Sequence, residues 1–153
     1  MLIKITKKIN RNILVCTRAD GSYTKVEMGS QLPFHDIAHY VVDKSLSIKN
    51  GFYGLIAQGY TIEQLSDKQV IKTLGAEAWI SEVLARALGS LYTGSCSLEQ
   101  FIPLIQTEMK GRGEEDKIPI LDEEKVLEML AEYTALLSEW RNLPDGGAVE
   151  MIF

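Results

Sequence analysis

The sequence is poor in the residues that form disulfide and metal frameworks. Among 153 residues it has two cysteines, Cys16 and Cys96, and two histidines, His35 and His39. The cysteines form no Cys-x-x-Cys pair and are too few for a disulfide framework, so we expect both to be reduced. Metal chemistry, if there is any, has to use the two histidines with carboxylates.

Long apolar runs are absent as well. No run approaches the ~20 residues that cross a bilayer, and the first residues lack the apolar region of ~7–15 residues found in a signal peptide. We therefore expect a cytoplasmic location and no membrane contact. Apolar residues make up 46% and charged residues 24% of the chain, which is typical of a globular protein, and the length fits a single domain, residues 1–153.

Basic residues are concentrated at the start of the chain. Residues 1–30 contain six Lys and Arg against two acids, whereas the remainder contains 10 basic and 19 acidic residues. A basic segment can bind nucleic acid, but lysines that alternate with isoleucines are typical of the solvent face of a sheet. No aromatic interleaving supports base stacking. Nucleic acid is therefore a disfavoured partner, and we expect an unidentified small molecule or protein instead.

Alternating and β-branched segments predict strands at both ends of the chain. Residues 2–7, 13–17 and 23–28 predict an antiparallel meander, which residues 29–32 end. Its second turn carries the Asp20-Gly21 hairpin signal. Residues 149–153 predict a last strand, which would be an aggregation hazard unless paired, so we expect it to join the meander.

The segment between these strands predicts helices. The predicted helices cover residues 33–46, 67–92 and 122–141, and a further one begins at Ser97. Residues 51–59 predict a short helix or helical turn, and Thr61 is expected to cap a turn through Leu65. Pro33 suits a first helical turn, and Ser97 with Gln100 has the capping-box pattern. The sequence thus predicts an α+β fold, in which an N-terminal antiparallel β-meander, joined by a C-terminal strand, packs against four or five helices.

Both histidines lie one helical turn apart, with Asp36 directly after the first. His35-Asp36-x-x-His39 differs from the zinc-hydrolase helix motif His-Glu-x-x-His by one methylene. Residues four apart lie ~6 Å apart along the axis of a helix and on one face, so both imidazoles can bind one zinc or other divalent transition ion. Asp36 then has the catalytic role of polarising the metal-bound water, although its side chain is shorter than glutamate.

A third ligand is expected on the long predicted helix, since a catalytic zinc normally has three protein ligands. At ~100° per residue, Glu77 falls in the middle of the apolar face, where an unpaired carboxylate is costly, whereas Glu82 falls near the polar face. We therefore predict Glu77 as the third metal ligand. Asp43 lies ~12 Å along the axis from His35, too far to bind the same ion. We expect Asp43, with Tyr40, to support the histidines from outside the ligand set.

Two functions follow from this pattern. One is a metal-binding protein, with metal-dependent hydrolase as its enzyme class. The other is a non-enzymatic interaction module, in which the inward-facing histidines and Glu77 form a buried polar network without metal. A glutamate from a later helix also completes the site in one class of His-Glu-x-x-His enzymes, which this constellation resembles. HD-type phosphohydrolases are set aside, because they need further histidines that this chain lacks.

Four segments together resemble an uncharacterised bacterial family. They are residues 16–22, 33–43, 50–59 and 140–150, and they include a His-Asp-x-x-His-Tyr-x-Val-Asp/Glu helix followed by Gly-Phe-Tyr-Gly-Leu-x-Ala-x-Gly. The family pattern reads Pro-His-Asp, whereas Phe34 intervenes here, and it usually has Glu where this chain has Asp43. The resemblance implies the order of the elements and the choice of site, and it implies no activity.

Overall fold

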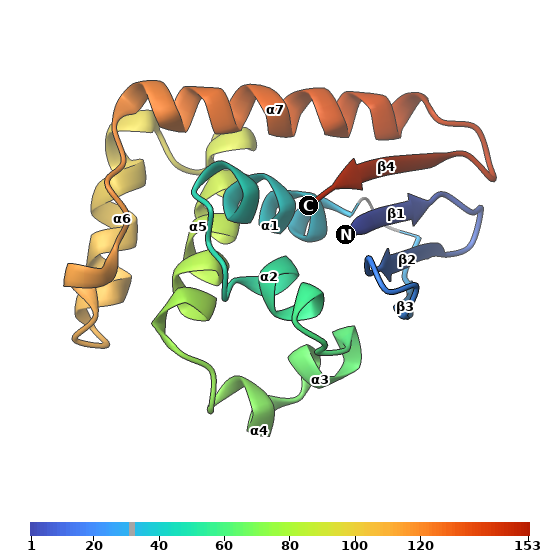
Figure 1. Cartoon of the computed structure of the whole chain (residues 1–153). Helices are drawn as coiled ribbons and strands as arrows, with labels where there is room; N and C mark the ends of the chain where they lie inside the picture. Colours follow the sequence, from blue (N-terminus) through green and yellow to red (C-terminus); the bar gives the residue numbers. More distant parts are fainter. Residues whose placement is uncertain (31–32) are drawn as a thin grey trace.

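The computed structural model describes residues 1–30 and 33–153, and it has the predicted α+β architecture (Figure 1). The strands are β1 (Leu2–Thr6), β2 (Asn12–Thr17), β3 (Tyr23–Met28) and β4 (Ala148–Ile152). They form one antiparallel sheet in the order β3-β2-β1-β4. The expected pairing of the C-terminal strand with the meander is confirmed, since β4 pairs with β1. The predicted end of the meander at residues 29–32 lies partly outside the described residues.

One face of the sheet is buried and the other carries cross-strand ion pairs. The buried side chains are Ile3, Ile5, Leu14, Cys16, Val149 and Met151. On alternate positions, Lys4 pairs with Glu150 at 2.7 Å and Arg11 pairs with Glu27 at 2.9 Å. Period-2 alternation of apolar and charged residues produces this division. Because acids neutralise these two basic residues, the meander offers less free positive charge than its composition indicates.

Seven α-helices and one short 3-10 helix occur in the described part of the chain, more than the four or five expected. They are α1 (Phe34–Ser45), α2 (Phe52–Ala57), α3 (Ile62–Ser66), α4 (Lys68–Ile71), α5 (Ala76–Tyr92), α6 (Leu98–Lys110), η1 (Glu115–Lys117) and α7 (Glu123–Asn142). The helix predicted over residues 67–92 is divided in two. Asp67 caps α4, which ends at Ile71, and α5 begins only after Gly75, whose backbone is extended. Thr73 and Gly75 between them are poor helix formers.

α1 is the central helix of the fold. In Figure 1 it lies between the sheet and α5, and it packs against α5, α7 and α2. Every residue from Ile37 to Asp43 is buried, as expected of a helix that is covered on all sides. Polar residues in this stretch therefore have to find partners within the protein.

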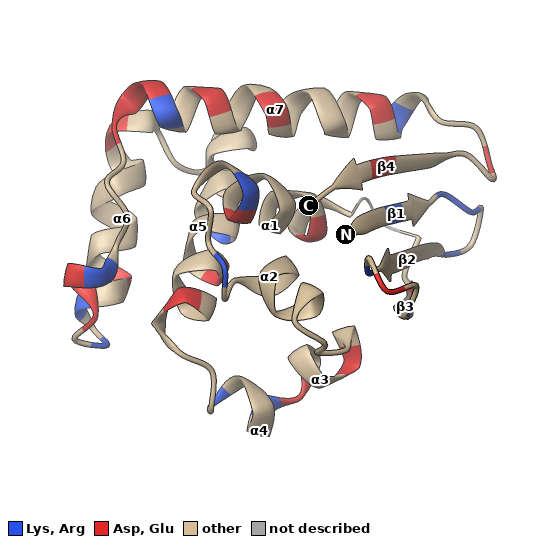
Figure 2. Cartoon of the chain, viewed as in Figure 1, with Lys and Arg blue, Asp and Glu red and all other residues tan. Residues whose placement is uncertain are grey.

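The long helix α7 has one buried and one charged face. Figure 2 shows acidic residues recurring along it. The face toward the core contains Val126, Met129, Tyr133, Leu137 and Trp140. Across residues 1–30 and 33–153, no helix combines the length and the apolar character that a membrane crossing requires. The cytoplasmic location stays a prediction.

Candidate metal centre

Three side chains from two helices converge where α1 packs against α5. Nε2 of His39 lies 3.1 Å from Nε2 of His35, and each of these nitrogens lies 3.2 Å from Oε2 of Glu82. Within the described residues, this is the one group of three such side chains whose ligand atoms all lie within 4.8 Å of one another. The histidines therefore form a single site, as their spacing of one helical turn allows.

The three atoms form a nearly equilateral triangle that fits a small cation. Atoms at these separations lie about 1.9 Å from the centre of a regular tetrahedron and about 2.2 Å from the centre of an octahedron. Zinc bonds to imidazole and carboxylate, at about 2.0–2.2 Å, fall between these values. Three protein ligands leave at least one coordination position for water or substrate, which is typical of catalytic zinc sites.

The site is open to solvent on one side. The side chain of His39 is 6% exposed, that of Glu82 35% and that of His35 52%. The expectation that both histidines face inward is therefore wrong for His35. It lies in the first turn of α1, before the run of buried residues begins at Ile37. A metal ion could enter from this side without any part of the core opening.

Electrostatics favour an ionised Glu82. Hydrogen bonds with His35 and His39 hold the pKa of its carboxyl well below the usual range. The hydrogen bond with Glu82 in turn raises the pKa of His35. The second carboxylate oxygen, Oε1, lies 3.3 Å from Nε of Arg86, which also pairs with Glu108 at 2.6 Å. Arg86 thus fixes the orientation in which Glu82 presents Oε2 to the histidines.

A series of polar groups continues from His39 into the core. Nδ1 of His39 lies 2.9 Å from Oγ of the buried Ser81. Burial raises the pKa of Asp43 to about 6, whereas the neighbouring Ser81 hydroxyl acts to lower it. Oδ2 of Asp43 accepts a 2.9 Å hydrogen bond from the backbone N–H of Tyr53, but Oδ1 has no hydrogen-bond partner among the described residues. Ser81 therefore lies between His39 and Asp43, which the sequence reasoning had expected to act on each other directly.

Tyr40 lies apart from the three converging atoms. Its hydroxyl donates to the carbonyl oxygen of Ile152 at 3.3 Å and accepts from Nζ of Lys44 at 2.8 Å. It therefore connects α1 with β4 and does not support the histidines as expected.

Asp36 is also outside the group, since its carboxylate oxygens do not lie within 4.8 Å of all three ligand atoms. Asp36 lies ~100° round the helix from His35. Burial, and after it the charge of Asp36, raises the pKa of Cys16 to about 12, and the same two causes raise the pKa of Tyr53. The position of Asp36 therefore gives no support to the predicted catalytic role at the metal.

Glu77, the predicted third ligand, does not meet the histidines. It lies exposed in the first turn of α5, where Oε2 accepts hydrogen bonds from the backbone N–H of Asn50 at 2.8 Å and from its Nδ2 at 3.0 Å. Glu82, on the same helix, occupies the expected place. The choice of Glu77 is wrong because α5 begins at Ala76, so Glu77 precedes the buried stretch that starts at Ile80.

Ser81 and Glu82 are the site residues that sequence reasoning missed. Ser81 is a hydroxyl among Ile80, Val83 and Leu84, and a single polar residue in an apolar stripe indicates a buried partner. Glu82 precedes Arg86 by one turn, which is typical of a solvated ion pair. Such a pair does form, but it uses only one of the two carboxylate oxygens, and no periodicity reveals the role of the other.

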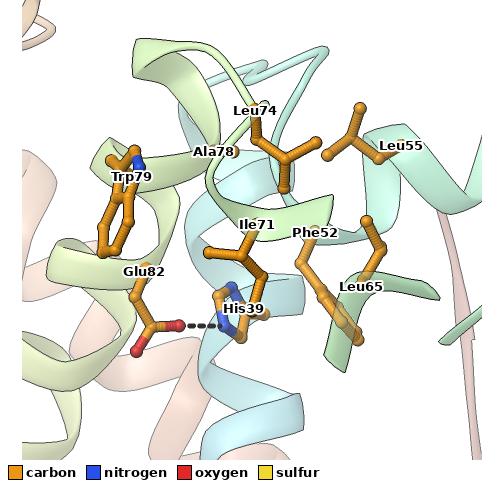
Figure 3. A pocket seen from close by; sticks show the side chains of 9 residues that line it. All are labelled: His39, Phe52, Leu55, Leu65, Ile71, Leu74, Ala78, Trp79 and Glu82. Carbon is orange, nitrogen blue, oxygen red and sulfur yellow. Dashed lines mark hydrogen bonds and ion pairs between the residues drawn. The ribbon is translucent and has the colours of Figure 1, made fainter. Parts of the chain in front are cut away.

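An apolar pocket begins at His39 and Glu82 (Figure 3). Its volume is about 280 Å³, and its remaining lining residues are Phe52, Leu55, Leu65, Ile71, Leu74, Ala78 and Trp79. The ring of Phe52 lies against the imidazole of His39, with 5.0 Å between the ring centroids. A second depression of about 480 Å³ includes His35, Arg86 and Glu108. The cluster therefore borders an apolar pocket and a more polar one.

Comparison with protein-family models, curated proteins and solved structures finds no match to this chain. The resemblance to the bacterial family stays a prediction. A functional assignment has to come from the geometry of the site itself.

Proposed function

We propose that this chain is a metal-binding protein in which His35, His39 and Glu82 hold one divalent transition ion, with zinc as the first candidate. The observation that carries the proposal is the convergence of two imidazole nitrogens and one carboxylate oxygen at 3.1–3.2 Å. Imidazole and carboxylate are ligands that zinc accepts readily. The lowered pKa of Glu82 keeps the carboxylate available as a ligand at neutral pH.

The hydrogen bonds behind His39 support the same proposal. A metal ion on Nε2 requires the imidazole proton to be on Nδ1, which then donates to Oγ of Ser81. The Ser81 hydroxyl proton is then not needed by His39 and is left for the carboxylate of Asp43, whose pKa Ser81 acts to lower. With the other tautomer, Ser81 would donate to Nδ1 of His39 and not to Asp43. The tautomer that metal binding needs is thus the one that leaves the Ser81 proton for the buried carboxylate.

Hydrolysis is the reaction class that we propose for the bound ion. Three protein ligands leave a coordination position for water, and zinc lowers the pKa of bound water to ~7. The half-exposed His35 keeps that position accessible to solvent. Asp36 is not the base in this proposal, because its carboxylate lies outside the cluster.

A second candidate is an interaction module in which the three side chains form a structural polar network. Part of the geometry fits it too, since a protonated His35 forms an ion pair with Glu82, although the three mutual contacts cannot all be hydrogen bonds at once because each Nε2 carries at most one proton. The two functions differ in one respect that can be measured. The network alone gives the same stability with and without metal or chelator.

Metal analysis of tag-free protein, purified without chelator and then exposed to Zn²⁺, distinguishes the two. We expect about one equivalent in the wild type, and less than ~0.2 equivalents in Glu82→Gln and in His39→Ala. Glu77→Gln is the matched control, because it neutralises a carboxylate on the same helix that bonds to Asn50. It should keep the full metal content.

Thermal unfolding provides the second readout. An ion at 100 times its Kd raises the free energy of unfolding by about 2.7 kcal/mol, and this gain should be absent in Glu82→Gln. Wild-type protein that takes up less than ~0.2 equivalents of Zn²⁺, Mn²⁺ or Fe²⁺ overturns the proposal. Metal uptake that Glu82→Gln leaves unchanged overturns it as well.

A further inference from the structure

We infer that the apolar pocket beside the cluster binds the hydrocarbon part of a small monocarboxylic acid, whose carboxylate coordinates the ion on His35, His39 and Glu82. This inference rests on the proposed function, because the ion provides the site for the acid group. It adds the chemical class of the ligand, which the three-residue cluster alone does not specify.

The lining of the pocket separates a polar end from an apolar body. Figure 3 shows His39 and Glu82 at one end, with Leu55 and Leu74 at the opposite end. Seven of the nine lining residues are apolar, and Ile71 and Trp79 are among them. A ligand that fills this space therefore needs an apolar body with polar atoms only at the end near the cluster. Sugars and nucleotides would leave most of their polar groups without partners.

The charge at the polar end selects the head group. Among the described residues, no lysine or arginine lines the pocket. A divalent ion with one carboxylate and two neutral imidazoles has a net charge of about +1, so it attracts an anion and repels an ammonium group. Carboxylate oxygen is also a good ligand for such an ion. The head group that fits is therefore a carboxylate rather than an ammonium or an uncharged alcohol.

The volume limits the length of the hydrocarbon. A cavity of about 150 Å³ holds one benzene molecule. By the same ratio, the 280 Å³ of this pocket holds roughly eleven non-hydrogen atoms. Octanoate and 3-phenylpropanoate are of about this size. Acids of the size of acetate would leave most of the pocket without contacts, and acids much longer than decanoate would not fit inside it.

The test is calorimetric titration of zinc-loaded wild-type protein with butanoate, hexanoate and octanoate. Each added methylene that enters the pocket should lower Kd about fourfold, so octanoate should bind about 15-fold more tightly than hexanoate. Octylamine should bind at least about tenfold more weakly than octanoate. Trp79 gives an independent signal, since it lines the pocket while Trp140 is buried in the core, and its fluorescence should change on addition of octanoate.

Two substitutions test the location. Ala78→Phe places a ring in the pocket and should weaken octanoate binding at least about tenfold without changing the zinc content. Ala135→Phe, at an exposed position of α7, is the matched control and should bind as the wild type does. If Ala78→Phe does not fold, the dependence of Kd on the length of the acid, measured with the wild type, still tests the inference.

The outcomes separate this inference from the proposed function. If zinc binds at one equivalent but the Kd of the acids does not depend on the length of their hydrocarbon, the inference is overturned and the metal site stands. Equal affinity for octanoate in zinc-loaded and EDTA-treated protein also overturns it, because the head group would then not be on the ion. Failure of zinc to bind at all is the failure of the proposed function. Chain-length dependence that disappears with EDTA supports both.

Discussion

The replacement Asp43→Asn tests whether burial raises the pKa of the carboxyl that lies behind the metal centre. Asp43 is fully buried, and burial raises its pKa from 3.8 to about 6. Asparagine keeps an oxygen for the backbone N–H of Tyr53 but cannot titrate. The difference in the free energy of unfolding between wild type and variant, measured across pH, therefore isolates the titration of this one group.

The sign and the size of this difference in stability follow from the raised pKa of Asp43. The pKa is higher in the folded state than in the unfolded state, so the native protein favours protonated Asp43. The stabilising contribution is fully present below pH 3.8 and is lost as the pH rises through about 6. At about 1.4 kcal/mol per pK unit, wild-type stability relative to Asp43→Asn should fall by about 3 kcal/mol between about pH 4 and about pH 8.

The assay is urea unfolding followed by circular dichroism, at several pH values and in EDTA, so that metal does not contribute. Asp116→Asn, at an exposed position in η1, controls for the loss of a negative charge. A difference that is constant within about 0.5 kcal/mol refutes the reasoning. A difference that grows with pH would mean that Ser81 and the start of α2 stabilise the carboxylate more than burial penalises it.

Two further substitutions, each with a matched partner, test how the framework is held together. Nζ of Lys7 donates to the carbonyl oxygens of Trp140, Arg141 and Leu143 at the end of α7. Lys7→Met should therefore lower the free energy of unfolding by about 1–2 kcal/mol. If the exposed Lys8→Met lowers it by the same amount, this explanation is contradicted. A Cβ on Gly54 would lie 2.6 Å from the carbonyl carbon of Lys49. On Gly89, the nearest described atom outside the local helix backbone would be the Tyr133 hydroxyl, at 4.0 Å. In urea unfolding, Gly54→Ala should therefore lower the free energy of unfolding by at least about 2 kcal/mol. Gly89→Ala should raise it by up to about 1 kcal/mol. If both substitutions change stability in the same direction, these contacts do not govern the change in stability.

Local patterns in the sequence predicted the elements well. The third strand has the predicted bounds, the predicted capping box at Ser97 is present, and Thr61 caps the short helix α3 where a capped turn was predicted. Each of these features depends on residues within a few positions of one another. That β4 joins the meander was predictable for another reason, since an apolar strand requires a partner, but its pairing with β1 in particular was not predicted.

The third member of the site could not be predicted in the same way. The histidines lie four apart on one helix, so their proximity follows from the geometry of α1. The partner on α5 depends on where that helix begins and how it is rotated against α1. The predicted helix began at residue 67 and α5 begins at Ala76, and this error of nine residues led to Glu77 in place of Glu82. A helical wheel gives direction around an axis, but it does not give position along the neighbouring helix.

The sheet order has a consequence for how the protein is made. β1 pairs with β4 on one side, and these strands are residues 2–6 and 148–152. At about 5–20 residues per second, the ribosome needs on the order of 7–30 seconds to add the intervening chain. During that time β1 has only β2 beside it, and its other backbone edge is open to any strand nearby. A nascent-chain chaperone that covers this edge would protect β1 until β4 is made.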